Sequence, residues 1–126
     1  METGIKGTME RKVTETLTAR AIGSGELDVF ATPALIALAE ETAWRSVADA
    51  LEPGQGTVGT RMDLSHIAAT PVGMTARCET DLTAIDRRKL TFHIEVFDEV
   101  EKIAEGTHER FIVDNQKFQE KADSKA

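Results

Sequence analysis

The sequence has little of what a secreted or membrane protein uses. Cys78 is its only cysteine, so an internal disulfide is excluded and a cytoplasmic location is expected. No apolar run approaches the roughly 20 residues that a membrane-spanning helix requires. The charged beginning, METGIKGTMERK, lacks the apolar core of a signal peptide. We therefore expect neither membrane insertion nor export.

Basic residues are also scarce. The chain carries 15 Lys and Arg against 22 Asp and Glu, which gives a net charge of -7. Because nucleic acids are bound by basic surfaces, this balance argues against nucleic acid as a partner. No set of His, Cys and carboxylates has metal-ligand spacing, no glycine-rich phosphate loop follows a strand, and no Gly-x-Ser-x-Gly elbow is present. The sequence therefore predicts neither a metal nor a cofactor.

The composition that remains is that of one globular domain. Hydrophobic residues make up 40% of the chain and charged residues 29%. A length of 126 residues is enough for one hydrophobic core and too short for two. We expect a single domain over 1–126, with the polar ends 1–9 and 116–126 flexible.

The most apolar stretch, residues 29–50, predicts a long helix. Thr32 followed by Pro33 is typical of a helix start, with the threonine as N-cap and the proline as first helical residue. Pro53 and Gly54 end the helix. Backbone N–H groups at such a start can also hold a developing oxyanion, so Thr32 has a structural and a chemical interpretation.

Glu40 lies in an apolar row of this helix. The other members of the row, at helical spacing, are Ile36, Ala43 and Val47. Its neighbour Glu41 has Arg45 four residues later, which is the favourable order for an exposed ion pair. Glu41 is thus expected in solvent, and Glu40 is the candidate for an interior, chemical carboxylate. The alternative is a half-buried row in which Glu40 reaches solvent or a partner subunit.

Alternating patterns predict one strand before this helix and four after it. The expected strands cover 13–21, 56–70, 74–84, 90–96 and 103–114, with a bulge near Gly106 in the last. One long helix with a curved antiparallel sheet predicts an α+β domain in which the sheet wraps around the helix.

His66 ends a series in the second strand that points toward the core, shared with Val58, Thr60, Met62 and Leu64. A carboxylate and an imidazole that face one core form a general acid/base pair, which favours Glu40 and His66 together. Thr32 and Glu40 lie about 12 Å apart along a helix, so a site using both needs a bridging substrate or two subunits. Cys78, in mid-strand, is interpreted as a core residue rather than a nucleophile, and His93 as solvent-facing. His108 is left open.

Several segments carry a family resemblance. VFATP, then Glu40, EPGQGTVGT, SHIAATPVGM and EGTHERF resemble, in order and spacing, the fluoroacetyl-CoA thioesterase family of hotdog proteins, from about Val13 to Phe118. The resemblance implies a hotdog fold, a homodimer or larger homo-oligomer with its site at the subunit interface, and hydrolysis of a short acyl-CoA. It implies catalytic roles for Thr32, Glu40 and His66, and substrate binding by Gly59 and Arg110.

Two alternatives to hydrolysis stay open within the hotdog fold. One is a non-catalytic acyl-CoA-binding protein, and the other is an enoyl-CoA hydratase or dehydratase. The family member that confers fluoroacetate resistance also carries an aromatic-rich lid before its FAT motif. Here the corresponding AIGSGELDVF has no aromatic residue before Phe30. We therefore expect no preference for fluoroacetyl-CoA.

Overall fold

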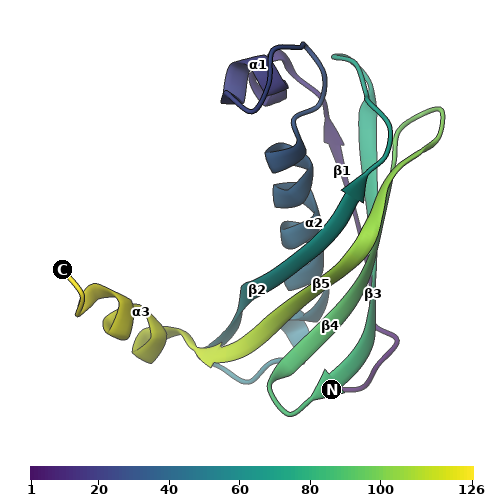
Figure 1. The fold of residues 1–126 in the computed structure, drawn as a ribbon. Helices are drawn as coiled ribbons and strands as arrows, with labels where there is room; N and C mark the ends of the chain where they lie inside the picture. Colours follow the sequence, from purple (N-terminus) through teal and green to yellow (C-terminus); the bar gives the residue numbers. More distant parts are fainter.

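The computed structural model describes all 126 residues and curls a five-stranded sheet around one long helix (Figure 1). Short helical segments precede the long helix, and one helix follows the sheet. The elements in order are β1 (Lys6–Lys12), η1 (Glu15–Leu17), α1 (Ala19–Ile22), α2 (Thr32–Val47), η2 (Ala48–Ala50), β2 (Gln55–His66), β3 (Thr75–Asp86), β4 (Lys89–Phe97), β5 (Lys102–Asp114) and α3 (Asn115–Asp123).

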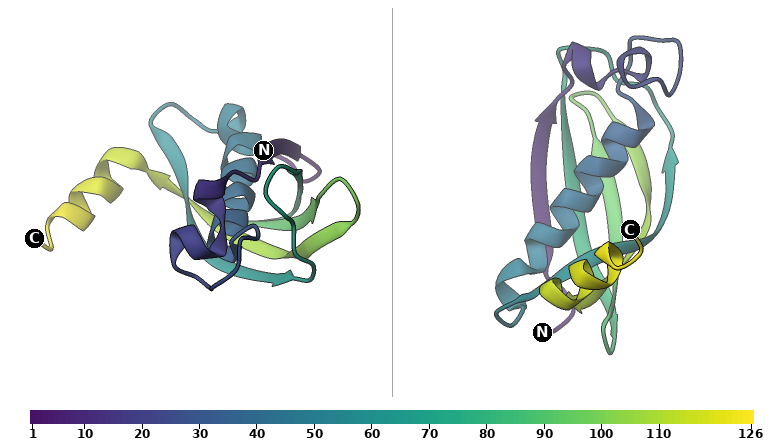
Figure 2. Two further views of the ribbon diagram at one scale, coloured as in Figure 1. Left: turned by 90° about the horizontal axis from the view of Figure 1, so that it is seen from above. Right: turned by 90° about the vertical axis from the view of Figure 1, so that its left-hand side faces the viewer.

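All strand pairs are antiparallel, in the order β1-β3-β4-β5-β2. The strands β1 and β2 are therefore the two edges, and each offers one row of unpaired backbone groups. The sheet wraps around α2, as the view from above shows (Figure 2). The predicted α+β architecture is confirmed.

The core lies between α2 and the concave face of the sheet. The helix buries Leu35, Leu38 and Ala43, which pack against alternate residues of β3 and β4. The sheet residues in this core are Ala76, Cys78, Leu82, Leu90, Phe92, Ile94 and Val96. The alternation predicted for 90–96 is confirmed, because each of these side chains stands on the pleat facing the helix. Cys78 is a buried core residue, and burial raises the pKa of its thiol to about 11.

The strand predicted over 13–21 is wrong. The first strand is β1, which pairs with β3 and includes residues expected to be a flexible leader. Residues 15–22 instead form η1 and α1, because the hydroxyl of Thr18 accepts the N–H of Ala21 as an N-cap and Gly23 ends α1 at φ +90°. Threonines that favour a strand by propensity serve here in helix capping.

The end of the chain forms α3, over residues expected to be flexible. The carboxylate of Asp114 accepts the N–H of Lys117 and caps this helix. The helix projects away from the sheet and has no buried residue (Figure 2).

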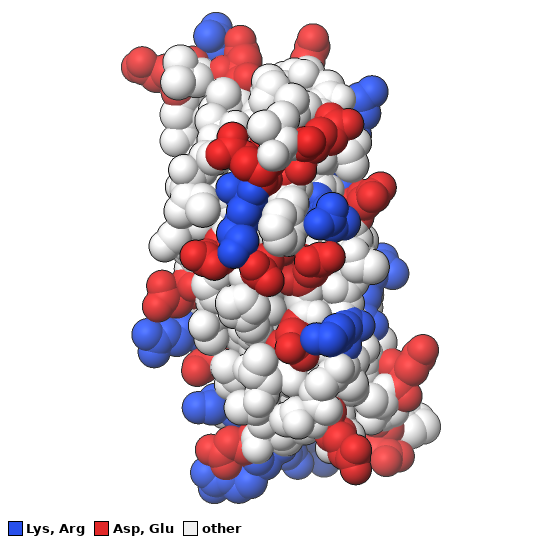
Figure 3. All heavy atoms as spheres, turned by 90° about the vertical axis from the view of Figure 1, so that its right-hand side faces the viewer, with Lys and Arg blue, Asp and Glu red and all other residues white.

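The convex face of the sheet is covered by charges of both signs (Figure 3). Ion pairs such as Lys6 with Asp81 and Lys102 with Glu95 cross between strands there. His93 is on this face, as predicted, with its side chain 49% exposed. None of the helices is both long and apolar enough to cross a membrane.

Candidate active site

The beginning of α2 meets the end of β2 at a pair of side chains. The Thr32 hydroxyl lies 2.8 Å from Nδ1 of His66. The predicted N-cap role of Thr32 is wrong, because Ala31 occupies that position and Thr32 is the first helical residue. Its hydroxyl is therefore not used by the helix and serves the histidine instead.

The first turn of α2 also leaves backbone donors unused. The N–H groups of Phe30 and Ala31 donate to the carbonyls of Thr70 and Leu17. Those of Thr32 and Ala34 have no backbone acceptor, and Pro33 has no N–H to satisfy. Two free donors and the positive end of the helix dipole thus adjoin the Thr32 hydroxyl.

The imidazole of His66 is poised as a neutral base. Burial lowers its pKa, and the nearby backbone of Ala68 partly offsets this effect. The second ring nitrogen, Nε2, is buried and has no hydrogen-bond partner within the chain. An unpaired buried nitrogen costs free energy. The imidazole is thus hydrogen-bonded at Nδ1, by Thr32, and lacks a partner at Nε2.

A hollow of about 320 Å³ opens beside this pair. Thr32 and His66 line it together with Ala19, Ser24, Val29, Phe30, Ile67, Ala68 and Ala69. The lining is mostly small and apolar, which suits a short acyl chain next to a hydroxyl and an imidazole.

The other predicted residues gather farther along α2, where β2 is interrupted by a bulge. Gly59 pairs with Arg110 and Arg61 with Glu109, so Thr60 is an extra residue without a partner. The extra residue reverses which side chains face the helix. Thr57 and Gly59 face it before the bulge, and Met62 and Leu64 after it.

This bulge corrects two predictions. The uniform alternation expected through 56–70 holds only after Thr60. The bulge expected near Gly106 is absent there, since Gly106 pairs in register with Leu64 and with Ile94. A side chain at Gly106 would instead collide with the backbone carbonyl of Asp63. Glycine at that position is explained by close strand approach.

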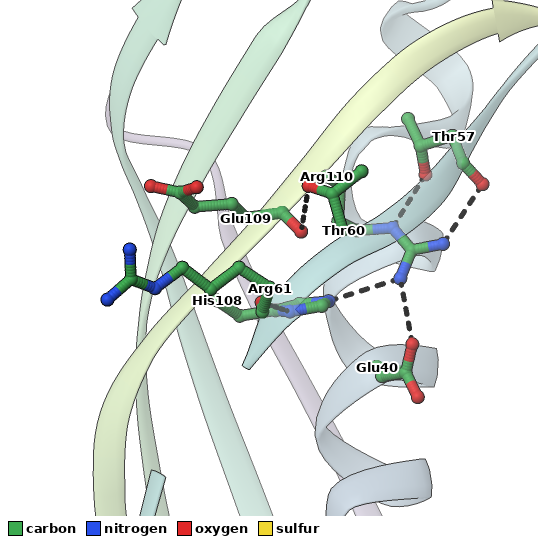
Figure 4. Close-up of polar contacts among 7 residues, drawn as sticks. All are labelled: Glu40, Thr57, Thr60, Arg61, His108, Glu109 and Arg110. Atoms are coloured by element: carbon green, nitrogen blue, oxygen red, sulfur yellow. Dashed lines mark hydrogen bonds and ion pairs between the residues drawn. The ribbon is translucent and has the colours of Figure 1, made fainter. Parts of the chain in front are cut away.

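Arg110 lies at the centre of a second cluster of side chains, which is separate from the Thr32 and His66 pair (Figure 4). It is 5% exposed, its Nε donates to Thr57 Oγ1 at 2.8 Å, and its Nη2 donates to the Thr57 carbonyl at 2.9 Å. Its Nη1 lies 3.5 Å from Glu40 Oε2 and 3.1 Å from Nε2 of His108. Gly59 permits this approach, because a Cβ there would lie 2.6 Å from Glu40 Oε2 and 3.2 Å from Nη1.

Glu40 is not the interior carboxylate that the helical row predicts. Its side chain is 44% exposed, and it lies beside the buried face of α2 rather than on it. The predicted pair of Glu41 with Arg45 is confirmed at 2.7 Å, and Arg11 adds a second contact to Glu41 at 2.8 Å.

Within one chain, the structure therefore brings the predicted residues together as two clusters. Thr32 and His66 form one, and Glu40, Gly59 and Arg110 form the other. Glu40 does not line the hollow beside His66. The sequence interpretation left His108 open and did not single out Thr57, although both bond to Arg110. No group of residues with metal-binding potential is found.

The relationship of this chain to known proteins is clear. The family model for fluoroacetyl-CoA-specific thioesterases matches residues 13–116. The chain belongs to this family. A fluoroacetyl-CoA thioesterase from Streptantibioticus cattleyicolor is 38% identical to it over 98 residues, which cover 78% of this chain and 70% of the relative. The sequence resemblance is confirmed.

Solved structures agree with membership of the fluoroacetyl-CoA-specific thioesterase family. A structure of the fluoroacetyl-CoA thioesterase FlK superposes with a TM-score of 0.94 at 32% identity, covering 100% of this chain and 98% of that one. A variant of the same enzyme in complex with acetyl-CoA gives 0.95 at 32% identity, covering 100% and 99%. A thioesterase superfamily member from Thermus thermophilus, at 22% identity, covers 94% and 88% with a TM-score of 0.86 and shares the fold. The predicted hotdog fold is confirmed.

Proposed function

We propose that this thioesterase hydrolyses a neutral, short-chain acyl-CoA at a site built jointly by two copies of the chain. One copy supplies Thr32 and His66, and the partner copy supplies Glu40 with Gly59 and Arg110. The observation that carries the proposal is the separation of the two clusters within one chain. Glu40 does not line the hollow beside Thr32 and His66, and the imidazole has no carboxylate partner in its own chain. Glu40 of a second copy would supply that carboxylate.

The free edge of β2 provides a way to join two copies. An unpaired edge strand readily pairs with the same strand of another chain. If two β2 strands pair antiparallel about a two-fold axis through Asp63, with Thr60 again the extra residue, Gly59 of one copy lies opposite His66 of the other. Glu40 and Arg110 stand over Gly59 and would therefore approach the partner's Thr32 and His66 pair. A homodimer is the smallest assembly that completes the site.

The chemistry follows from the order of the side chains. Neutral His66 accepts a proton through Nδ1 from the Thr32 hydroxyl or from a water held by it. The carboxylate of Glu40 from the partner copy stabilises the imidazolium that forms. The free N–H groups of Thr32 and Ala34 hold the oxyanion, and the CoA thiolate leaves and takes the proton from the imidazolium. If Thr32 attacks, a threonine ester forms, and a water activated by the same histidine then hydrolyses it to the free acid. These steps use no metal or separate cofactor, because CoA is part of the substrate.

Charge and volume define the acyl group. The hollow of about 320 Å³ admits a short chain. An anionic acyl end is disfavoured because Glu40 is negative and Arg110 already donates four of its five N–H groups within the chain. The residues before Phe30 contain no aromatic lid, and Leu27 there is 66% exposed. The proposed substrate is therefore a small aliphatic acyl-CoA without fluoroacetyl preference. We propose the cytoplasm as the place of the reaction.

Free-thiol release from acetyl-, propionyl-, fluoroacetyl- and succinyl-CoA tests the substrate. We expect release from the neutral esters and little from succinyl-CoA. Tight binding by calorimetry without release would identify an acyl-CoA-binding protein instead, and loss of enoyl-CoA absorbance would identify a hydratase.

Subunit mixing tests the shared site. Glu40→Gln and His66→Ala are each expected to be inactive. A mixed dimer has one site that combines intact His66 from the first variant with intact Glu40 from the second. Mixing therefore restores activity if the site is shared, and restores none if both residues act within one chain.

A further inference from the structure

We propose that His108 is a positioning residue for hydrolysis: it fixes the guanidinium of Arg110 beside Gly59 and, through it, the carboxylate of Glu40. The proposal rests on the proposed function, in which Glu40 completes the site of a partner copy. His108 touches neither the hollow nor the Thr32 and His66 pair. Its effect on the reaction passes through Arg110.

The two bonds of His108 determine where its proton lies (Figure 4). Its side chain is fully enclosed, with 1% of the residue exposed. Nδ1 lies 2.7 Å from the Arg61 carbonyl, which can only accept a hydrogen bond. Nε2 lies 3.1 Å from Nη1 of Arg110, which can only donate. His108 is thus neutral, with its proton on Nδ1 and a lone pair on Nε2.

Burial supports the same protonation state. It lowers the pKa of His108, and the positive charge of Arg110 lowers it further, whereas the Arg61 carbonyl and the carboxylates of Glu40 and Glu109 act in the opposite direction. The ring of Phe92 lies against His108, with the ring centres 6.2 Å apart. The imidazole is therefore held by packing as well as by its two hydrogen bonds.

The position of the Arg110 guanidinium depends on this acceptor, because Nη1 lies between two acceptors, His108 and Glu40. Its Nε and Nη2 are held by Thr57, at 2.8 and 2.9 Å. The Nη1 contact to His108 is 3.1 Å, whereas the contact to Glu40 is 3.5 Å. His108 therefore holds the guanidinium back from Glu40, whose 44% exposed carboxylate stays available to a partner copy.

Removing the acceptor has a defined consequence. A buried N–H of Arg110 would lose its partner, and the only other acceptor beside Nη1 is Glu40. The guanidinium would close on the carboxylate and draw it away from the partner subunit. Small displacements of a catalytic group cost up to about 100-fold in rate. The loss belongs to kcat, because the hollow for the acyl chain is untouched.

Two substitutions separate the acceptor from the packing. His108→Gln keeps an amide oxygen that can accept from Nη1, whereas His108→Leu fills similar space with no acceptor. With the best acyl-CoA, we expect His108→Leu to lower kcat about 10- to 100-fold with little change in KM. His108→Gln should retain most of the activity. Ile94→Val, a core change without polar contacts, controls for loss of packing.

A spectroscopic measurement tests the hydrogen bond between His108 and Arg110 without reference to activity. Long-range ¹H–¹⁵N correlation spectra of the wild-type protein should show His108 protonated on Nδ1 alone, with slowly exchanging side-chain N–H signals from Arg110. These Arg110 signals should be lost in His108→Leu and kept in His108→Gln.

The outcomes separate this inference from the function on which it rests. If the wild-type protein releases no thiol, the proposed hydrolysis is overturned. The spectra still test the hydrogen bond between His108 and Arg110. An active wild type with equal losses in both His108 variants, or with no loss in either, overturns the positioning role. A proton found on Nε2 does so as well. If His108→Leu does not fold, the activity of His108→Gln and the wild-type spectra decide.

Discussion

The Thr32 hydroxyl and Nδ1 of His66 are 2.8 Å apart, and this contact joins the first residue of α2 to the last residue of β2. A threonine hydroxyl is a weak nucleophile unless a base stands within hydrogen-bond reach. Here the base is present and burial keeps its pKa low. The helix start and the strand end therefore supply the two side chains of the proposed catalytic pair.

Replacing His66 tests the base. His66→Ala should lower kcat/KM for thiol release by about 100- to 10,000-fold, the usual contribution of general base catalysis. His93→Ala, at an exposed position on the convex face, is the matched control and should stay within about twofold of wild type. Equal activities for the two variants would contradict the assignment.

Thr32→Val separates the hydroxyl from the fold. Because Thr32 is not the N-cap, the free energy of unfolding should change by less than about 0.5 kcal/mol, whereas loss of a true cap costs about 1 kcal/mol. Thiol release should nevertheless fall by about 100-fold or more. Thr32→Ser keeps the hydroxyl and should retain activity. Urea denaturation and kinetics on the same samples measure both effects, and a destabilised but active Thr32→Val would restore the capping interpretation.

Stability should depend on pH through the buried histidines. In the folded state the pKa values of His66 and His108 lie below their ordinary value of about 6.5, chiefly because of burial. The unfolded chain therefore binds protons first as the pH falls through about 6.5, so the free energy of unfolding decreases on acidification and is fully present above that pH. Glu41, Glu95 and Asp98, with lowered pKa values, titrate at lower pH.

Denaturant titrations at about pH 7.5 and about pH 5.5 measure this dependence. His66→Gln removes one of the two buried histidines, so the free energy of unfolding should differ less between the two pH values. An unchanged free energy of unfolding in wild type would contradict the burial argument. The activity of wild type should likewise extend below about pH 6.5, since the neutral base persists there.

Gly59→Ala tests the close approach of Glu40 to β2. The added methyl group would lie 2.6 Å from Glu40 Oε2 and must displace the carboxylate. We expect a fall of about 100-fold in kcat/KM. The free energy of unfolding should change little, because the displaced atom is the end of a flexible side chain that is 44% exposed. Thr83→Ala, at an exposed position on β3, is the control. Full activity of Gly59→Ala would show that Glu40 does not need this position.

The sequence predicted what depends on regular periods. The long helix, the alternation of β4 and the pair of Glu41 with Arg45 all follow from spacing of 3.6 or 2 residues, and all are present. The family resemblance supplied the hotdog fold and assigned one site to Thr32, Glu40 and His66. Within one chain, the structure brings only Thr32 and His66 together.

The failures occur where local geometry breaks a period. The extra residue Thr60 reverses the faces of β2. The glycine beside it, Gly59, gives no clearer signal of a bulge than Gly106, which pairs in register. Thr18 caps a helix although the threonines around it favour a strand by propensity. The contacts of His108 were also hidden. The Arg61 carbonyl reaches it across a strand pair, and the contact with Arg110, two residues along β5, requires both side chains to face the helix.

The bulge at Thr60 constrains the pairing register of β2. If the same residues formed a regular ladder without the bulge, Thr57 and Gly59 would turn toward the outer face. Arg110 would lose both of its Thr57 bonds, and Glu40 would face a side chain where it now faces a hydrogen atom. Homologues with this arrangement should therefore accept many substitutions in β2, but should lose the bulge only together with the extra residue, which leaves the pairs of Gly59 with Arg110 and of Arg61 with Glu109 intact.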